Sequence, residues 1–240
     1  MAQLEEDSSW IDRWNEIRDA VQEVLGDTEP PNSVTPFSWK QFLLPGACAM
    51  NFNPTADRND FLSMTLGITQ LQQENQQTYP WEFSVRSYDL MEWPVDLLYQ
   101  LTTQWLFEQG DIWFGYRLPL VFFKDKEDIM WAGLSDEITE LNVIGAIRAM
   151  YFWTDEMNLR FSYSSGEFSL LTVVAVTEDE DRLAQETTPA HLILLMQCLG
   201  LSQVCDPFRQ SVLSLPDADR EWFRIRSMSH DAALDELQRK

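Results

Sequence analysis

The sequence predicts an α/β (α+β) protein in which a mixed, largely antiparallel sheet is flanked by helices. Apolar and polar residues alternate over residues 61–69 and 81–86, which is typical of strands. Over residues 10–25 and 94–106, apolar residues recur at three- and four-residue intervals, which indicates amphipathic helices. An unbroken apolar run at residues 168–176 indicates a buried strand. Strand and helix patterns follow one another along a single chain, so we expect one α/β domain.

The N-terminal segment predicts a helix followed by a loop. The helix begins at Ser8 or Ser9, with Asp12 in a capping-box position, and ends near Gly26. Its apolar stripe consists of Trp10, Trp14, Ile17, Val21 and Leu25. Three prolines between residues 27 and 36 predict a loop, because proline interrupts regular hydrogen bonding.

The central segment predicts strands and a second helix. Short strands are expected at residues 50–52, 61–69 and 81–86, and the glutamine-rich residues 70–78 read as an exposed hairpin connection. The alternating apolar residues are Leu62, Met64, Leu66 and Ile68 in one strand and Trp81, Phe83 and Val85 in the next. Pro94 suits the first turn of a helix that ends at Gly110. This helix is expected to bury Val95, Leu98, Leu101, Thr102, Trp105 and Leu106.

The C-terminal half predicts four strands, a helix and a helical tail. The strands are expected at residues 117–123, 147–153, 159–163 and 168–176. A helix follows Thr188, stops at Gly200 and buries Leu192, Leu195, Met196 and Leu199. In the tail, Trp222, Ile225, Leu234 and Leu237 indicate a helical pair that packs on the body or on a partner. The expected division is therefore an N-terminal helix and loop at 1–36, the main domain at 37–215 and the tail at 216–240.

The chain is strongly acidic. Its 240 residues hold 39 Asp and Glu against 17 Lys and Arg, so the net charge is −22. Such a surface repels phosphate backbones and anionic lipid, which argues against nucleic-acid and membrane partners. It favours a basic protein partner, because complementary charge speeds association. The alternative is that the acidity serves only solubility.

Three cysteines, Cys48, Cys198 and Cys205, have no paired spacing, which argues against a disulfide scaffold. The acidic N-terminus does not resemble a signal peptide, and the apolar runs are too short to span a bilayer. Together these features predict a cytoplasmic protein.

Chemistry-bearing motifs are scarce. The two histidines, His191 and His230, lack metal-ligand spacing, and the sequence contains no phosphate-binding glycine loop and no nucleophile elbow. Carboxylate pairs such as Glu178/Glu180 are best read as parts of a solvated face. We therefore expect no catalytic residue, no cofactor and no metal.

One acidic segment has a direct structural explanation. Thr177 can cap a helix whose first turn is acidic, and negative charge is favourable at that end of a helix. A partner-binding role for Glu178 and Asp179 remains an alternative. Asp206 and Arg209, three residues apart, are expected to pair locally and hold a short return strand.

These features occur in an order that resembles the suppressor-of-fused domain, in its bacterial stand-alone form. The matching stretches are the apolar strand ending at residues 174–178, the leucine-rich helix at 192–199, and Asp206-Pro207-Phe208-Arg209. Upstream, residues 93–101 follow an alternating strand, as in the family. The motif residues are Trp93, Pro94, Thr177, Glu178, Asp206 and Arg209; Ala175 stands where the family often has glycine. The resemblance spans about residues 48–213.

The resemblance implies a non-enzymatic protein-binding module. The animal member sequesters a transcription factor, and stand-alone bacterial copies are thought to be immunity proteins that bind and occlude a toxin. By position in the family, the implied partner-binding residues are Asp125, Glu127 and Asp128, with Glu178 and Asp179 added from the acidic segment. Two other functions stay open: an adaptor that binds an extended peptide by strand addition, and a small-molecule binder with a tryptophan-lined pocket.

Overall fold

The computed structural model divides the chain into two compact units, which we describe separately. Unit 1 comprises Met1–Ile112 with Thr154–Thr172, and unit 2 comprises Trp113–Trp153 with Val173–Lys240. The structure describes residues 8–25, 33–39, 42–55, 58–70, 79–88, 93–102, 112, 114–119, 147–157, 159–164, 166–206 and 209–239. The predicted boundaries after residues 36 and 215 stay predictions.

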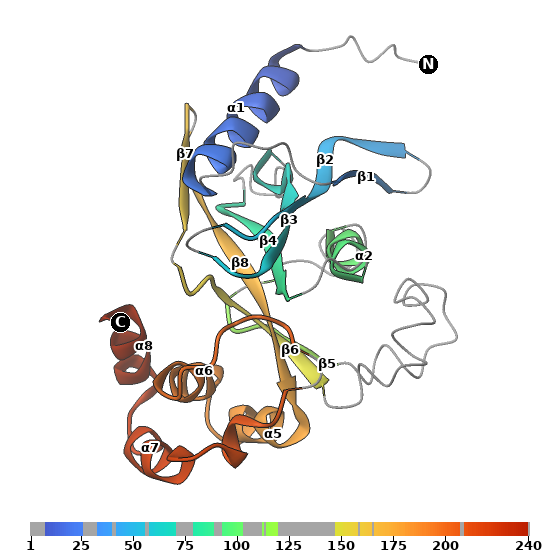
Figure 1. Cartoon of the computed structure of the whole chain (residues 1–240). Helices are drawn as coiled ribbons and strands as arrows, with labels where there is room; N and C mark the ends of the chain where they lie inside the picture. The colour runs from blue at the N-terminus through green and yellow to red at the C-terminus, as the bar shows by residue number, and fades with distance from the viewer. Residues whose placement is uncertain are drawn as a thin grey trace. The chain divides into compact units, whose positions relative to one another are not determined.

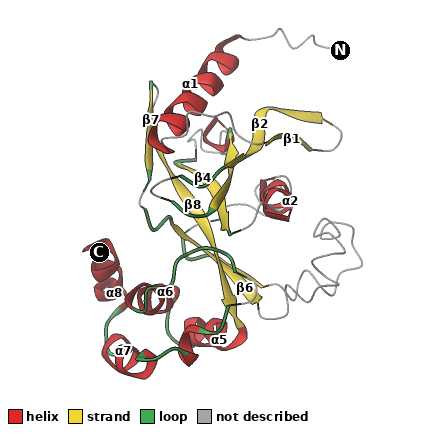
Figure 2. Cartoon of the chain, viewed as in Figure 1, coloured by secondary structure: helices red, strands yellow, loops and turns green. Residues whose placement is uncertain are grey.

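The described strands form a mixed, mostly antiparallel sheet, as the sequence predicts (Figures 1 and 2). The hydrogen-bonded order is β1-β2-β3-β4-β8-β6-β5, with β7 paired to β8. The bounds are β1 (Ser33–Trp39), β2 (Phe42–Phe52), β3 (Phe61–Leu66), β4 (Trp81–Ser87), β5 (Arg117–Pro119), β6 (Ile147–Thr154), β7 (Arg160–Tyr163) and β8 (Gly166–Thr177). Five of the pairings, β1–β2, β2–β3, β3–β4, β5–β6 and β7–β8, are antiparallel, whereas β4 and β8 run parallel.

In unit 1 the strands pack against helix α1 (Ser8–Leu25) and helix α2 (Trp93–Gln100). The predicted apolar stripe of α1 is confirmed for Ile17, Val21 and Leu25, which are buried against β2, β3 and the β7–β8 hairpin. The hairpin is also held by hydrogen bonds, because the Ser164 N–H and hydroxyl both donate to the Glu16 carboxylate, at 2.9 and 2.7 Å. The predicted burial of α2 is confirmed for Val95 and Leu98.

Both faces of β3 and β4 are buried, although each strand alternates apolar and polar residues. The register explains why. Met64 lies opposite Ser84, and Ser63 lies opposite Val85, so the apolar side of β3 neighbours the polar side of β4. Polar and charged groups are therefore buried within unit 1.

Strand β1 corrects the predicted loop. Residues 33–36 pair with β2, and the register shifts between Pro36 and Ser38. Proline is tolerated there because β1 is a terminal strand among the described strands and one side of its backbone needs no partner. The expected strand at 50–52 is likewise the end of the longer β2.

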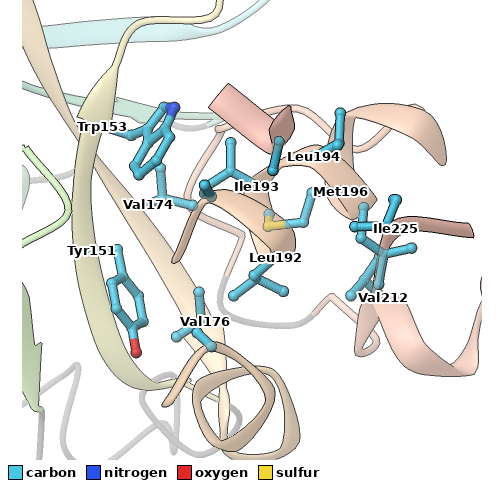
Figure 3. Close-up of a cluster of buried hydrophobic side chains, with 14 of the residues drawn as sticks. Tyr151, Trp153, Val174, Val176, Leu192, Ile193, Leu194, Met196, Val212 and Ile225 are labelled. Carbon is cyan, nitrogen blue, oxygen red and sulfur yellow. The ribbon is translucent and has the colours of Figure 1, made fainter. Parts of the chain in front are cut away.

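Unit 2 is organised around helix α6 (Pro189–Cys198), whose residues 190–196 are all buried. Around it lie α5 (Glu178–Glu186), the short 3-10 helix η3 (Val212–Ser214), α7 (Ala218–Ile225) and α8 (His230–Arg239). Figure 3 shows Leu192 and Met196 lying between Tyr151 and Val176 on one side and Val212 and Ile225 on the other. Both tail helices contact α6, and Gly200 follows α6 with a φ of 73°, as the predicted stop requires.

The predicted return strand is wrong. Residues 212–214 form η3, and the preceding described residues are irregular. The residues before η3 contact β8 through two side chains. The Cys205 thiol donates to the Val173 carbonyl at 3.5 Å, and the Arg209 side chain donates to the Ala175 carbonyl at 2.9 Å.

Some predictions fall on residues outside those that the structure describes. They are the glutamine-rich connection at 71–78, the end of the second helix with Trp105 and Leu106, and the extension of the strand beyond Pro119. No helix among the described residues is both long enough and apolar enough to cross a membrane.

Candidate functional site

The residues singled out by the sequence meet where β8 ends and α5 begins. We call this region of unit 2 the α5 junction: Thr177, residues 178–181, Arg209 and Ser211. The predicted cap is confirmed, since the Thr177 N–H donates to the Glu180 carboxylate at 2.8 Å. This bond joins the helix end to one of its own first-turn carboxylates.

Glu180 is the buried centre of the α5 junction, with none of its surface exposed. Arg209 donates to both of its oxygens, at 2.6 and 2.5 Å, and the Val212 N–H adds a third bond at 2.6 Å. The sequence predicted that Arg209 pairs with Asp206. The ion pair that the structure gives Arg209 is with Glu180, whereas the contact with Asp206 runs through its backbone carbonyl.

Asp181, the next residue of the same helical turn, forms a second arginine pair. Arg117 of β5 donates to both carboxylate oxygens, at 2.6 and 2.5 Å. The Tyr151 hydroxyl and the Gln185 amide donate to the same carboxylate, at 2.8 and 2.9 Å. Burial and the bond to Asp181 raise the pKa of Tyr151, so this hydroxyl stays a donor. Glu180 and Asp181 are therefore structural, and the interpretation of the Glu178/Glu180 pair as part of a solvated face is wrong for Glu180.

The other two acidic residues of this turn differ. Asp179 accepts from the hydroxyls of Ser211 and Thr177, at 2.6 and 2.5 Å. Although burial opposes the change, these two bonds lower the pKa of Asp179, so it is ionised at neutral pH. Glu178 is exposed. Of the acidic residues in this turn, Glu178 and Asp179 are thus the ones still accessible to a partner.

The remaining site predictions have different outcomes. Trp93 and Pro94 begin α2, and Pro94 is buried, which suits its expected place in the first turn. Asp125, Glu127 and Asp128 lie outside the described residues. Their partner-binding role stays a prediction, as it does for Glu178 and Asp179.

A buried charge network in unit 1 was missed by the sequence reasoning. Asp60 is fully buried and accepts two bonds from Arg86, both at 2.8 Å, while Arg58 lies 3.6 Å away. Arg86 also pairs with Glu156. Burial opposes ionisation, yet the bonds from Arg86 to Asp60 raise the pKa of Arg86, so the arginine remains charged. The available signal was Arg86, a charged residue on the polar side of an alternating strand.

Charge is distributed unevenly between the two units. Arg58, Arg86, Arg117 and Arg209 are all engaged by carboxylates inside their own units. Over the sequence, unit 1 has 21 acidic and six basic residues, and unit 2 has 18 and 11. Two basic residues of unit 1, Arg58 and Arg86, are buried, as are three of its acidic residues, Asp60, Glu82 and Asp155. Unit 1 therefore keeps the larger acidic excess of the two.

No family model and no curated protein matches the chain. Solved structures do. The Sufu–Fu complex matches with a TM-score of 0.61 and 15% identity, over 90% of this chain and 98% of that one.

The chain has a suppressor-of-fused-like fold. A suppressor-of-fused homologue from Neisseria gonorrhoeae matches with a TM-score of 0.57 and 13% identity, over 86% of this chain and all of that one. Drosophila Suppressor of Fused matches with a TM-score of 0.55 and 14% identity, over 95% of this chain and 54% of that one. The resemblance predicted from the motif order is confirmed at the level of the fold.

Proposed function

We propose that the chain is a non-enzymatic protein-binding module of the immunity type, which binds a basic toxin and occludes it. The observation that carries this proposal is the acidic excess of unit 1, with 21 acidic residues against six basic ones. Burial removes two of those basic residues, Arg58 and Arg86, and three of the acidic ones, Asp60, Glu82 and Asp155, so the acidic excess remains. A surface of this kind attracts a basic protein and speeds its association.

The fold supports a binding role. One similar structure is a complex between Sufu and Fu, and another is a bacterial homologue that this chain covers over its whole length. The two accessible carboxylates of the α5 junction, Glu178 and Asp179, add candidate contacts in unit 2, and we propose Asp125, Glu127 and Asp128 as further contacts.

Strand addition is the second candidate. It is favoured because three of the described strands, β1, β5 and β7, each pair with a single described neighbour. Strands β1 and β5 contain Pro36 and Pro119, and proline on an edge removes a donor that an added strand needs. Strand β7 has no proline, but helix α1 packs against it. Occlusion of a folded basic partner therefore has the stronger support.

The test is capture of partners by the tagged chain from the cells that express it. The expected result is one basic protein that is retained at low salt, is lost as salt rises, and loses its own activity when the purified chain is added. Retention of many unrelated proteins that share a short motif would support strand addition instead. Retention of nothing at low salt would contradict both.

Two double variants, one in each unit, compare how much the charge of each unit speeds association with the partner. Asp12→Asn with Glu23→Gln removes two exposed charges from α1, and Asp231→Asn with Asp235→Asn removes two from α8. We expect the α1 pair to slow association with the captured protein several-fold and the α8 pair to change it less, because unit 1 carries the larger excess of acid. Equal slowing by the two pairs would contradict a dominant role for unit 1.

A further inference from the structure

Helix α7 of unit 2 carries the most exposed large apolar side chain among the described residues. The Phe223 side chain is 69% exposed, whereas the next, Tyr88, is 50% exposed. On the opposite side of α7, Ala218 and Ile225 are buried, and Figure 3 shows Ile225 in the core next to Val212. One side of α7 is therefore held by the core, and the side that carries Phe223 faces solvent.

Two oppositely charged residues flank Phe223 on this side of α7. Asp219 precedes it by four residues and Arg226 follows it by three, and residues at these spacings are neighbours on one face of a helix. The Arg226 N–H donates to the Trp222 carbonyl at 2.9 Å, which keeps Arg226 on the helical path. Its guanidinium lies over the Phe223 ring, 4.7 Å from the ring centroid, so the two side chains favour one arrangement.

The two flanking charges are not used within unit 2. Asp219 and Arg226 are both exposed, and neither forms an ion pair with another residue that the structure describes. The other two arginines of the helix, Arg220 and Arg224, are both paired with carboxylates of the same unit. An acid, an aromatic ring and an arginine thus form an exposed row, which we call the α7 row: Asp219, Phe223 and Arg226.

The α7 row is complementary to a second copy of itself. A twofold axis brings the same patch of two copies together, and it makes the two rows run in opposite directions. Phe223 then meets the same ring of the second copy near the axis, while Asp219 of each copy lies opposite Arg226 of the other. A parallel arrangement would instead place like charges opposite each other. Aromatic and arginine side chains are also the ones that contribute most to binding at protein interfaces.

We propose that the α7 row is the contact surface of a twofold dimer of this chain. Helix α7 has eight residues. It is therefore about 12 Å long, which gives a small contact and a weak, reversible dimer. The net charge of −22 opposes association. At physiological salt, however, charges further apart than about 8 Å are largely screened, whereas the pairs of Asp219 with Arg226 act at contact. The dimer does not depend on the proposed function, because the row contains none of the residues proposed to contact the toxin.

Sedimentation equilibrium of the full chain, from micromolar to millimolar concentration at physiological salt, tests the dimer. The average mass is expected to rise with concentration from that of one chain toward that of two. Phe223→Ala removes the central contact and is expected to weaken dimerisation about tenfold or more. A chain that stays monomeric throughout, or a Phe223→Ala variant that dimerises as strongly as the natural chain, would overturn the proposal.

A charge exchange tests the antiparallel geometry. Arg226→Asp gives the row two acids and Asp219→Arg gives it two arginines, so each variant alone is expected to dimerise about tenfold or more weakly, because like charges meet. In an equal mixture of the two variants, opposite charges meet at both ends of the row, and a mixed dimer is expected to form.

The control is Arg239→Asp, which makes the same charge change at an exposed position of α8 and is expected to alter dimerisation less than about twofold. Circular dichroism checks that each variant is folded. If the mixture of folded variants associates no better than each variant alone, the twofold contact through the α7 row is refuted.

Discussion

Two glutamates without any exposed surface, one in each unit, show two ways of burying a carboxylate. In unit 2, Glu180 is paired with Arg209 through two charged hydrogen bonds. In unit 1, Glu82 is surrounded by neutral donors. They are the hydroxyls of Thr65 and Thr69 and the backbone N–H groups of Gly67, Ile68 and Thr69, at 2.7 to 3.2 Å.

The difference lies in what each carboxylate holds together. Glu180 joins the start of α5 to Arg209 and Val212, about thirty residues further along the chain. Glu82 instead holds the tight turn between β3 and the 3-10 helix η1 (Ile68–Gln70). Neutral donors leave its charge uncompensated, and burial therefore raises the pKa of Glu82 despite five hydrogen bonds. An arginine partner fixes distant segments, whereas neutral donors fix a local turn.

The largest expected effect comes from removing the arginine partner. Arg209→Met leaves Glu180 buried with no cation, so we expect the free energy of unfolding to fall by about 3–5 kcal/mol. Urea denaturation followed by circular dichroism measures the change. The control is Arg220→Met, which removes an exposed partner of Asp217 and should cost at most about 1 kcal/mol. Equal losses in the two variants would mean that the buried pair of Arg209 and Glu180 stabilises the fold no more than an exposed pair does.

A smaller loss is expected at the neutral-donor site. Glu82→Gln replaces one acceptor oxygen by an NH₂ group that faces N–H and O–H donors, and a buried donor without a partner costs about 1–3 kcal/mol. The same denaturation experiment measures it, with the exposed Glu167→Gln as the control. If Glu82→Gln is as stable as the natural chain at neutral pH, the Glu82 side chain is protonated at that pH. The two buried glutamates would then differ in charge as well as in their partners.

The smallest expected effect concerns the pH dependence of unit 1. Burial raises the pKa of Asp155, which accepts from the Met157 N–H at 2.9 Å and the Thr172 hydroxyl at 3.2 Å. The folded chain therefore holds this proton up to a higher pH than the unfolded chain, so stability falls as pH rises between the two pKa values. Asp155→Asn cannot ionise and is expected to gain stability relative to the natural chain as pH rises from about 4 toward neutral. A difference that does not vary with pH would contradict the raised pKa.

Local periodicity was enough to predict much of the fold. The stripe of α1, the alternation in β3 and β4 and the stop of α6 at Gly200 depend on neighbours within a few residues, and the structure confirms them. The sequence analysis did not predict strand β1, because three prolines lie in or just before it and proline is typical of loops. Its strand geometry comes from hydrogen bonding to β2, a partner that periodicity does not reveal.

The sequence by itself determined the net charge, the order of the main elements and the resemblance in fold, because these depend on composition and on short-range spacing. Only the tertiary structure decided which charges remain on the surface. Arg209 pairs with Glu180 rather than with the nearby Asp206, and the apolar sides of β3 and β4 fall on opposite faces of the sheet. The first outcome depends on the path of the chain after α6, and the second depends on the register between β3 and β4. Both bring together groups that are far apart in sequence.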